Sequence, residues 1–203
     1  MATGARIIFV VMALASITGC TTTPPSNQQN LCEIFREKDG WYTDAADARE
    51  NWGSPIAIMM AIMHQESRFQ AKAKPPRNKL LGFIPWFRSS SAYGYSQAKS
   101  STWDWYQTSS GNYGADRDDF EDAIDFIGWY TDGSQKRLKL SKWDAYGQYL
   151  AYHEGRGGYS RKTFNKKPWL KKVAAKVKRR SSLYNTQLKS CKRRLDDAVD
   201  SWF

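Results

Sequence analysis

The sequence predicts a mainly α-helical fold with a central buried helix and no extensive sheet. The first observation behind this is a run of eight apolar residues, 56–63, directly after a Ser-Pro pair. The second is that three later segments, 119–130, 141–154 and 168–195, repeat apolar residues at the spacing of one helix face. The third is that no segment alternates apolar and polar residues as a half-buried strand does.

Composition indicates a folded and basic chain. The 203 residues include 31 Lys and Arg against 20 Asp and Glu, for a net charge of +11, and 14% of them are aromatic. Disordered segments are poor in aromatic side chains, so the composition excludes a disordered protein. A basic surface suits nucleic acid, an anionic membrane surface or an acidic polysaccharide, and charge alone does not choose among them.

The first 19 residues have the pattern of a secretory signal. An eleven-residue run, 7–17, contains a single polar side chain. It is too short to cross a bilayer as a mature helix and is typical of the apolar region of a cleaved signal. Residues 17–20, Ile-Thr-Gly-Cys, resemble the bacterial lipoprotein cleavage box. This resemblance implies removal of residues 1–19 and lipidation of Cys20, and an ordinary signal peptide with a coincidental cysteine is the alternative.

The resemblance also implies a location. Thr21, rather than Asp, follows the cysteine, which resembles the sorting pattern for the outer membrane. We therefore expect a periplasmic protein that is lipid-anchored to a membrane, more specifically the outer membrane. That compartment excludes DNA and RNA as partners, and we expect a monomer.

Beyond the signal we expect a short tether and one domain. Residues 20–30 are expected to be the lipidated cysteine and a flexible tether, because the ten residues after Cys20 hold a Pro pair and no charged or hydrophobic side chain. Residues 31–203 are expected to form a single folded domain. Cys32 and Cys191 then remain as a pair near its two ends. In an oxidising compartment we expect them to form a disulfide, with two unrelated buried thiols as the alternative.

The central helix is expected to begin with Ser54 as its N-cap and Pro55 at its first helical position. Eight consecutive apolar residues leave no polar face, so this helix must be surrounded on all sides. A basic, Pro-punctuated insertion follows at residues 71–91 and contains an apolar stretch at 80–87. A loop of this length is usually functional or carries short structure of its own. We expect the apolar stretch to wall a binding cleft, touch the membrane or pack on the domain.

Four further helices follow the insertion. The first is expected to have a capped start at residues 101–106, the second covers 119–130, and the third covers 141–154 and stops at the next glycine. From Pro168 onward the apolar positions describe a long amphipathic helix. Cys191 falls on its buried face, which supports the predicted disulfide.

A carboxyl at the end of the all-apolar helix is the most informative feature. Glu66 would emerge from the core at the helix C-terminus, where desolvation and the negative end of the helix dipole both raise its pKa. A carboxyl with a raised pKa can act as a general acid near neutral pH and protonate a glycosidic oxygen. The alternative is a Glu that turns to solvent or pairs with Arg68.

Three short motifs occur in order: Glu66-Ser67, Gly94-Tyr95-Ser96-Gln97 and Ala151-Tyr152-His153-Glu154-Gly155. In order and spacing they resemble the three signatures of the lytic transglycosylase SLT domain, a family with a lysozyme-like, mainly α-helical fold related to goose-type lysozymes. The resemblance covers about residues 52–155. In the second motif Tyr and Ser stand where the family usually has Leu and Met, and in the third His and Glu stand where Asn and Ala are usual.

The resemblance implies a peptidoglycan lytic transglycosylase. Glu66 would protonate the oxygen that links N-acetylmuramic acid to N-acetylglucosamine and then, as a carboxylate, accept the proton of the muramoyl C6 hydroxyl. That hydroxyl attacks C1 and gives a 1,6-anhydro end without water, while the acetamido group of the substrate stabilises the cationic centre. A hydrolytic muramidase and a non-catalytic peptidoglycan-binding lipoprotein are the alternatives.

The same motifs assign substrate-binding residues. Ser67 and Gln97 are expected to orient the acid or the N-acetyl group through hydrogen bonds. Tyr152 is expected to line the cleft near the acid, and His153 follows it in the same motif. Tyr95 is expected to stack on a sugar ring.

The remaining residues are weaker candidates for a role at the site. Glu154 offers itself as a second acid, but an exposed helix-terminal position is the preferred interpretation. Tyr93 is a weaker candidate for sugar stacking. No third ligand stands at metal spacing from His64 or His153, so we expect no metal and no cofactor. Four tryptophans are expected in the core: Trp103, Trp105, Trp129 and Trp143.

The basic charge is concentrated near the C-terminus. Residues 161–194 contain 14 Lys and Arg and no Asp or Glu. These charges exceed the net +11 of the whole chain, so the remainder is slightly acidic. The segment is expected to bind the anionic peptide stems of peptidoglycan or an anionic membrane surface, and a solvated helix face is the alternative.

Overall fold

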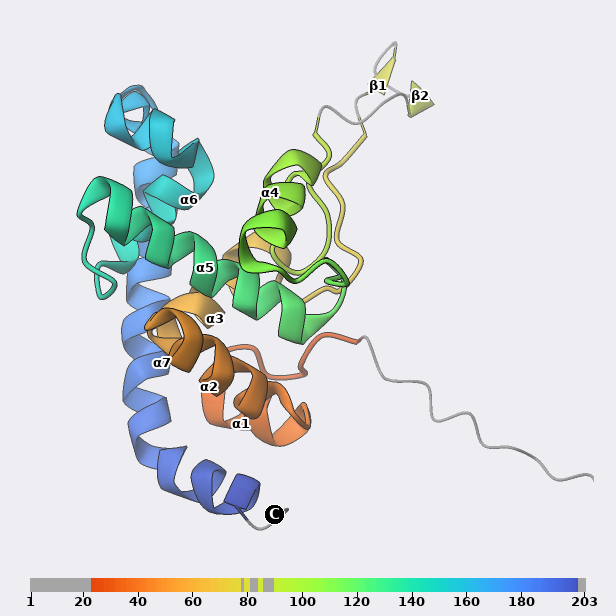
Figure 1. Cartoon of the computed structure of the whole chain (residues 1–203), viewed down its shortest axis with the longest axis vertical. Helices are drawn as coiled ribbons and strands as arrows, with labels where there is room; N and C mark the ends of the chain where they lie inside the picture. The colour runs from red at the N-terminus through yellow and green to blue at the C-terminus, as the bar shows by residue number, and fades with distance from the viewer. Residues whose placement is uncertain (1–22, 78, 81–83, 86–89, 201–203) are drawn as a thin grey trace, which may run out of the picture.

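The structure is a computed structural model that describes residues 23–77, 79–80, 84–85 and 90–200 (Figure 1). The predicted mainly α-helical fold is confirmed, since a two-stranded hairpin is the only sheet in the described residues. In chain order the elements are α1 (Leu31–Glu37), α2 (Trp41–Trp52), α3 (Ile56–Ser67), β1 (Lys79–Leu80), β2 (Ile84–Pro85), α4 (Ser100–Ser110), α5 (Phe120–Leu138), α6 (Ala145–Ser160), the 3₁₀ helix η1 (Thr163–Lys166) and α7 (Pro168–Asp200).

The helix α3 lies at the centre of the core. Every residue from Ile56 to Met63 is at most 3% exposed, and α2, α5 and α7 pack around it. Burial of each large apolar side chain contributes roughly 1.5–3 kcal/mol. The prediction of a central helix surrounded on all sides is therefore confirmed.

The start of α3 differs from the prediction by one residue. Pro55, not Ser54, is the N-cap, and its carbonyl accepts the amide protons of Ile58 and Met59. The buried Ser54 hydroxyl is used elsewhere: it lies 2.6 Å from the Thr131 hydroxyl of α5. The serine thus joins two core helices instead of capping one.

The starts of two other helices, α4 and α6, also differ from the prediction. The helix α4 begins at Ser100 after Lys99, and no side chain caps it. The helix α6 begins at Ala145, not at residue 141, because the Asp144 carboxylate accepts from the amide of the third residue of the helix. The predicted stop at Gly155 is a kink: its φ of 73° interrupts α6, which then resumes to residue 160.

The other two helices predicted after the insertion are present, and both extend beyond the predicted residues. The helix α5 starts after Asp119, whose side chain accepts from the Asp122 amide, and continues to Leu138. The helix α7 runs for 33 residues and contacts α1, α3 and α6 along its length. Cys191 is 4% exposed on its buried face, as predicted.

The insertion at residues 71–91 carries short structure of its own. The strands β1 and β2 pair antiparallel, with Lys79 opposite Pro85 and Leu80 opposite Ile84. Most of the apolar stretch at 80–87 lies outside the described residues, and so do residues 1–22 with the predicted signal and Cys20. In the part of the chain that the structure describes, no helix combines the length and the apolar character needed to span a bilayer.

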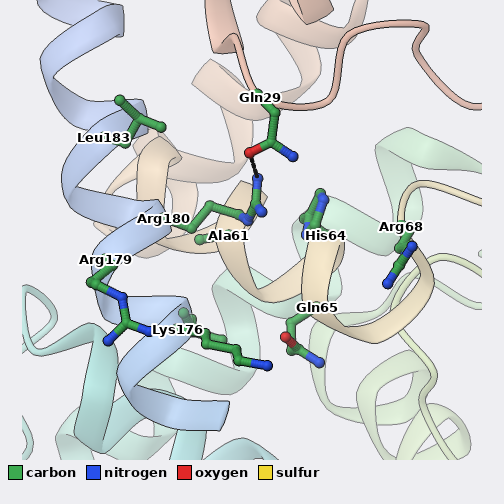
Figure 2. Close-up of a pocket in the computed structure, with 10 residues that line it drawn as sticks. Gln29, Ala61, His64, Gln65, Arg68, Lys176, Arg179, Arg180 and Leu183 are labelled. Carbon is green, nitrogen blue, oxygen red and sulfur yellow. Dashed lines mark hydrogen bonds between the residues drawn. The ribbon is translucent and has the colours of Figure 1, made fainter. Parts of the chain in front are cut away.

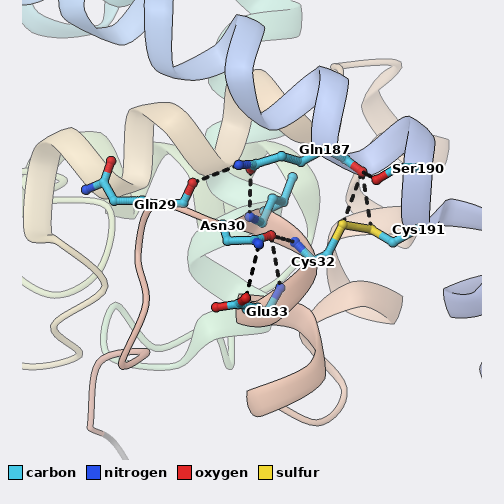
Figure 3. The surroundings of a disulfide bond; sticks show 8 residues. Gln29, Asn30, Cys32, Glu33, Gln187, Ser190 and Cys191 are labelled. Carbon is cyan, nitrogen blue, oxygen red and sulfur yellow. Dashed lines mark hydrogen bonds between the residues drawn. A yellow bond between two sulfur atoms is a disulfide. The ribbon is translucent and has the colours of Figure 1, made fainter.

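A disulfide joins Cys32 of α1 to Cys191 of α7, as predicted (Figure 3). Gln187, one turn before Cys191, reinforces this junction. Its side-chain carbonyl accepts from the Leu31 amide at 2.9 Å, and its amide group donates to the Gln29 carbonyl at 3.0 Å.

The end of the expected tether is fixed rather than flexible. The Ser26 hydroxyl and amide both donate to the Glu37 carboxylate, and the Tyr184 hydroxyl of α7 donates to the Gln28 carbonyl at 2.5 Å. Asn30 caps α1 by accepting from the amides of the second and third residues of the helix. Uncharged side chains and backbone groups of this segment thus dock it onto α1 and α7. Composition alone predicts a flexible tether here because it does not show these hydrogen bonds.

Two of the four tryptophans expected in the core are not there. Trp103 and Trp129 are 5% and 8% exposed, as expected. Trp105 and Trp143 are 39% and 69% exposed. Trp105 instead stacks beneath two guanidinium groups, those of Arg137 and Arg156, at 5.0 and 4.9 Å from its ring, and such cation–π contacts stabilise an aromatic ring at the surface.

The disulfide predicts a large dependence of stability on oxidation. It closes a loop with a sequence separation of 159 residues, and loops of this size lose much conformational entropy in the unfolded state. Replacing both cysteines by alanine should lower the free energy of unfolding by about 2–5 kcal/mol in urea titrations. A double variant as stable as the oxidised wild type contradicts this expectation.

Candidate active site

The site is organised around Glu66 in the last turn of α3. The helix ends at Arg68, whose φ of 52° turns the chain away. The Oε1 atom of Glu66 is buried and has no hydrogen-bond partner among the described residues. Burial raises the pKa of Glu66 to about 7, although a hydrogen bond with Tyr149 favours the ionised form. The carboxyl is therefore poised to hold a proton near neutral pH and to donate it.

Two tyrosines of α6 lie against this carboxyl. Tyr149 is its hydrogen-bonding partner, and both burial and the charge of Glu66 raise the pKa of the phenol. Burial raises the pKa of Tyr152, and the charge of Glu66 raises it further. Its hydroxyl donates to the Ser96 carbonyl at 2.6 Å, and its ring packs on Tyr130 at 5.0 Å. Both phenols thus stay protonated and remain hydrogen-bond donors beside the acid.

The loop that receives the Tyr152 hydroxyl has a backbone that only certain residues tolerate. Gly94 has a φ of 76°, and a Cβ atom there would lie 1.8 Å from the Arg117 carbonyl oxygen. Gln97 has a φ of 51°, and its amide group donates to the carbonyls of Ala73 and Gly94, both at 2.9 Å. Gln97 therefore braces the loop from within.

The three sequence motifs meet at this point. Glu66 comes from the first, the backbone of Ser96 from the second and Tyr152 from the third. Ser67 and Gln97, which were expected to orient the acid or the N-acetyl group, form hydrogen bonds with backbone carbonyls. The Ser67 hydroxyl donates to the Met63 carbonyl at 3.2 Å, and the described residues show no hydrogen bond from either side chain to the Glu66 carboxyl.

The expected sugar-stacking role of Tyr95 is not supported. Tyr95 is 4% exposed, and its ring packs edge-on against Trp41 and Phe120 with centroids 5.8 and 5.9 Å away. Its ring faces are covered by the core. Aromatic side chains in a small helical domain are commonly used for packing, and this one follows that pattern.

His153 is exposed and lies at the junction of α6 and α7. Its Nδ1 atom is 3.2 Å from the Glu154 carboxylate, and its ring contacts Trp169 at 5.2 Å. Among the described residues, His153 contacts Tyr149, Glu154 and Trp169 but not the acid. Tyr93 is only partly buried, with its hydroxyl donating to Asp118 at 3.0 Å, and it stays a candidate for contact with a ligand.

Glu154 is not the exposed helix-terminal residue that was expected. Its side chain is 4% exposed. Burial alone raises its pKa, but hydrogen bonds from Lys167, Thr163 and His153 outweigh burial and lower the pKa to about 2. The Lys167 ammonium lies 2.7 Å from the carboxylate. Glu154 is therefore permanently ionised near neutral pH, ties α6 to the segment before α7, and is unsuited to donate a proton.

Tyr149 is the site residue that the motifs missed. It lies three residues before Tyr152, which is the spacing that places two side chains on one face of a helix. That spacing was visible in the sequence, but a tyrosine outside a recognised motif carried no reason to prefer it over core packing. Within the ranges that the structure describes, no group of three or more His, Cys, Asp or Glu is arranged to hold a metal ion.

Comparison with known proteins gives one match. The family model described as the transglycosylase SLT domain matches residues 8–191, which is most of the chain. No curated protein and no solved structure matches.

The raised pKa of Glu66 predicts how stability changes with pH. The folded pKa of about 7 exceeds the ordinary value of 4.5, so the contribution of Glu66 to stability is fully present below pH 4.5 and is lost as pH rises through 7. Relative to Glu66→Gln, wild type should lose about 1–3 kcal/mol of unfolding free energy across this window in urea titrations. The matched control is Glu50→Gln, an exposed residue of α2, which should track wild type. A flat difference between wild type and Glu66→Gln contradicts the assignment.

Proposed function

The chain belongs to the transglycosylase SLT domain family, and on this premise we propose that it is a lytic transglycosylase of peptidoglycan. The bond cleaved is the β-1,4 linkage between N-acetylmuramic acid and N-acetylglucosamine, and the product is a 1,6-anhydromuramoyl end. The observation that carries the proposal is the Glu66 carboxyl, with a pKa of about 7 and a buried oxygen without a partner, beside two tyrosines.

The reaction uses one carboxyl twice. Glu66 donates its proton to the glycosidic oxygen as the bond from C1 to that oxygen breaks, and N-acetylglucosamine leaves as an alcohol. The carboxylate then accepts the proton of the muramoyl C6 hydroxyl while that oxygen bonds to C1. The proton balance closes, no water is consumed, and Glu66 is ready for another turnover.

A single-carboxyl mechanism fits the surroundings of Glu66. Most glycoside hydrolases need a second carboxylate as nucleophile or base, with substrate-assisted enzymes as the exception. Glu154, the only other acid in the three motifs, is held in an ion pair with Lys167 at 2.7 Å. The positive charge that develops at C1 is then stabilised by the substrate's own acetamido group. The Tyr149 hydroxyl, which is hydrogen-bonded to the carboxyl, keeps the acid in place.

We also propose that Cys20 is lipidated and anchors the enzyme in the periplasm, at the outer membrane. The support is the cleavage box at residues 17–20 with Thr21 after it. The mature protein should then begin at Cys20 and carry the added mass of acyl chains in a mass spectrum. An unmodified Cys20 thiol in the mature protein rejects the anchor and leaves the enzymatic proposal untouched.

Replacing the acid should abolish the reaction. Digestion of purified sacculi by wild type should release muropeptides lighter by one water than their hydrolytic counterparts, as measured by mass spectrometry. Glu66→Gln keeps the size of the side chain but has no proton to donate, so release should fall by about 10³-fold or more.

The control and the contrary outcomes are distinct. Glu50→Gln, at an exposed position of α2 outside the three motifs, should release muropeptides at the wild-type rate. Products of full hydrolytic mass from wild type indicate a muramidase. Wild type that binds sacculi but releases nothing indicates a non-catalytic wall-binding protein.

A further inference from the structure

A pocket of about 470 Å³ lies between α3 and α7, outside the cluster formed by Glu66, Tyr149 and Tyr152 (Figure 2). Figure 2 shows side chains of α3 on one wall and side chains of α7 on the other. Four cations line it, and no Asp or Glu is among its described lining residues: Arg68, Lys176, Arg179 and Arg180. Its volume falls within the range of small-molecule sites.

The positive charge in this pocket is not neutralised by the protein. Arg180 is held in place by the Gln28 carbonyl at 3.3 Å and the Gln29 side-chain carbonyl at 3.1 Å, both uncharged acceptors. Arg68, Lys176 and Arg179 are exposed. Within the described part of the chain none of the four forms a salt bridge. The pocket therefore presents to a ligand one cation that hydrogen bonds hold in place, Arg180, and three exposed cations whose side chains can reorient.

The same positive charges act on His64, which lies on the α3 wall of the pocket. Burial and the positive charges of Arg180 and Arg68 lower the pKa of His64 to about 4. The imidazole is therefore neutral at physiological pH and adds a hydrogen-bonding group without adding charge. An anion that enters the pocket meets an uncompensated positive potential together with a neutral donor.

The remaining lining residues favour an anion carried on a peptide. Leu183, which is exposed, provides an apolar surface beside the buried Ala61 and Val177, and Gln29 and Gln65 provide amide groups. Amides pair with peptide groups, and aliphatic surface covers short side chains. A concave site that mixes these groups with cations fits carboxylates on a short peptide. A bilayer, in contrast, is a flat surface that contacts protruding side chains rather than the walls of a pocket.

The pocket and the acid share one end of α3. Gln65, a lining residue, directly precedes Glu66, and Arg68 follows it by two positions. The acid and the pocket therefore lie at the same end of α3, and an extended peptide, which spans about 3.3–3.6 Å per residue, is long enough to lead from a glycan strand bound at Glu66 toward the pocket. In peptidoglycan those substituents are short peptides with free carboxylates, attached to the muramoyl lactate.

We propose that the pocket between α3 and α7 binds a carboxylate of the peptide stem carried by the glycan strand. This inference rests on the proposed function, since it takes peptidoglycan as the substrate. It assigns a specific role to part of the basic C-terminal helix: selection of strands that still bear peptides. Glycan stripped of its peptides leaves the pocket empty and binds more weakly.

Binding can be measured apart from catalysis. The probes are a muramoyl disaccharide with its peptide and the same disaccharide without it, neither of which contains the bond to be cleaved. Titration calorimetry with wild type should show about tenfold tighter binding of the peptide-bearing form, because charge-assisted contacts are among the stronger hydrogen bonds. Raising the salt concentration should weaken the preference.

The decisive comparison uses two double variants of α7. Lys176→Gln with Arg179→Gln removes two exposed cations that line the pocket. Lys172→Gln with Lys178→Gln removes the same charge from exposed positions of the same helix half, outside the pocket lining. The first should lose the preference for the peptide-bearing form, and the second should keep it.

Each contrary result is informative. Equal affinity of wild type for both disaccharides, or equal loss in the two double variants, overturns the proposal. If the pocket variant keeps the preference but loses binding to vesicles of anionic phospholipid, the pocket is a membrane contact and the proposal is wrong. If wild type prefers the peptide-bearing disaccharide but releases nothing from sacculi, the pocket stands and the enzymatic proposal fails.

Discussion

The burial of α3 is the constraint on which the rest of this structure depends. Eight consecutive apolar residues give the helix no side that can face water, so other helices must cover every side of it. The helices α2, α5 and α7 do this, although they are far apart in the sequence. Because α3 is fixed on all sides, the side chain at its exit is fixed as well, and that side chain is Glu66.

The neighbours of a buried carboxyl determine whether it can donate a proton. The side chains of Glu66 and Glu154 are both buried, and burial raises the pKa of each. Glu154 meets a lysine ammonium and a threonine hydroxyl, which hold it ionised. Glu66 meets phenols and has an oxygen with no partner. The difference between a structural carboxylate and a proton donor therefore lies in the neighbours, not in the depth of burial.

Much of the helical framework and the position of the acid were predictable from sequence, whereas the neighbours of most site residues were not. Apolar periodicity identifies a helix and its buried face, and so it also placed Cys191. Apolar periodicity does not predict which residues a buried hydroxyl or ring will contact. The sequence favours Ser54 as a cap because it does not show the partner on α5, 77 residues away. It favours Tyr95 as a sugar platform because it does not show Trp41 and Phe120 packing against the ring. It favours an exposed Glu154 because Lys167 reaches this carboxylate only after α6 ends and the chain turns back.

The link between α1 and α7 determines how the protein bears load. A pull on the N-terminal segment reaches the fold at residues 26–30, which are hydrogen-bonded to α1 and α7, and then at the covalent bond from Cys32 to Cys191. The force passes into the side of a 33-residue helix, so α1 cannot be peeled away from α7. Since α7 also packs on α3, a pull on the N-terminal segment is taken up by the disulfide and by α7 before it reaches the hydrogen bonds around Glu66.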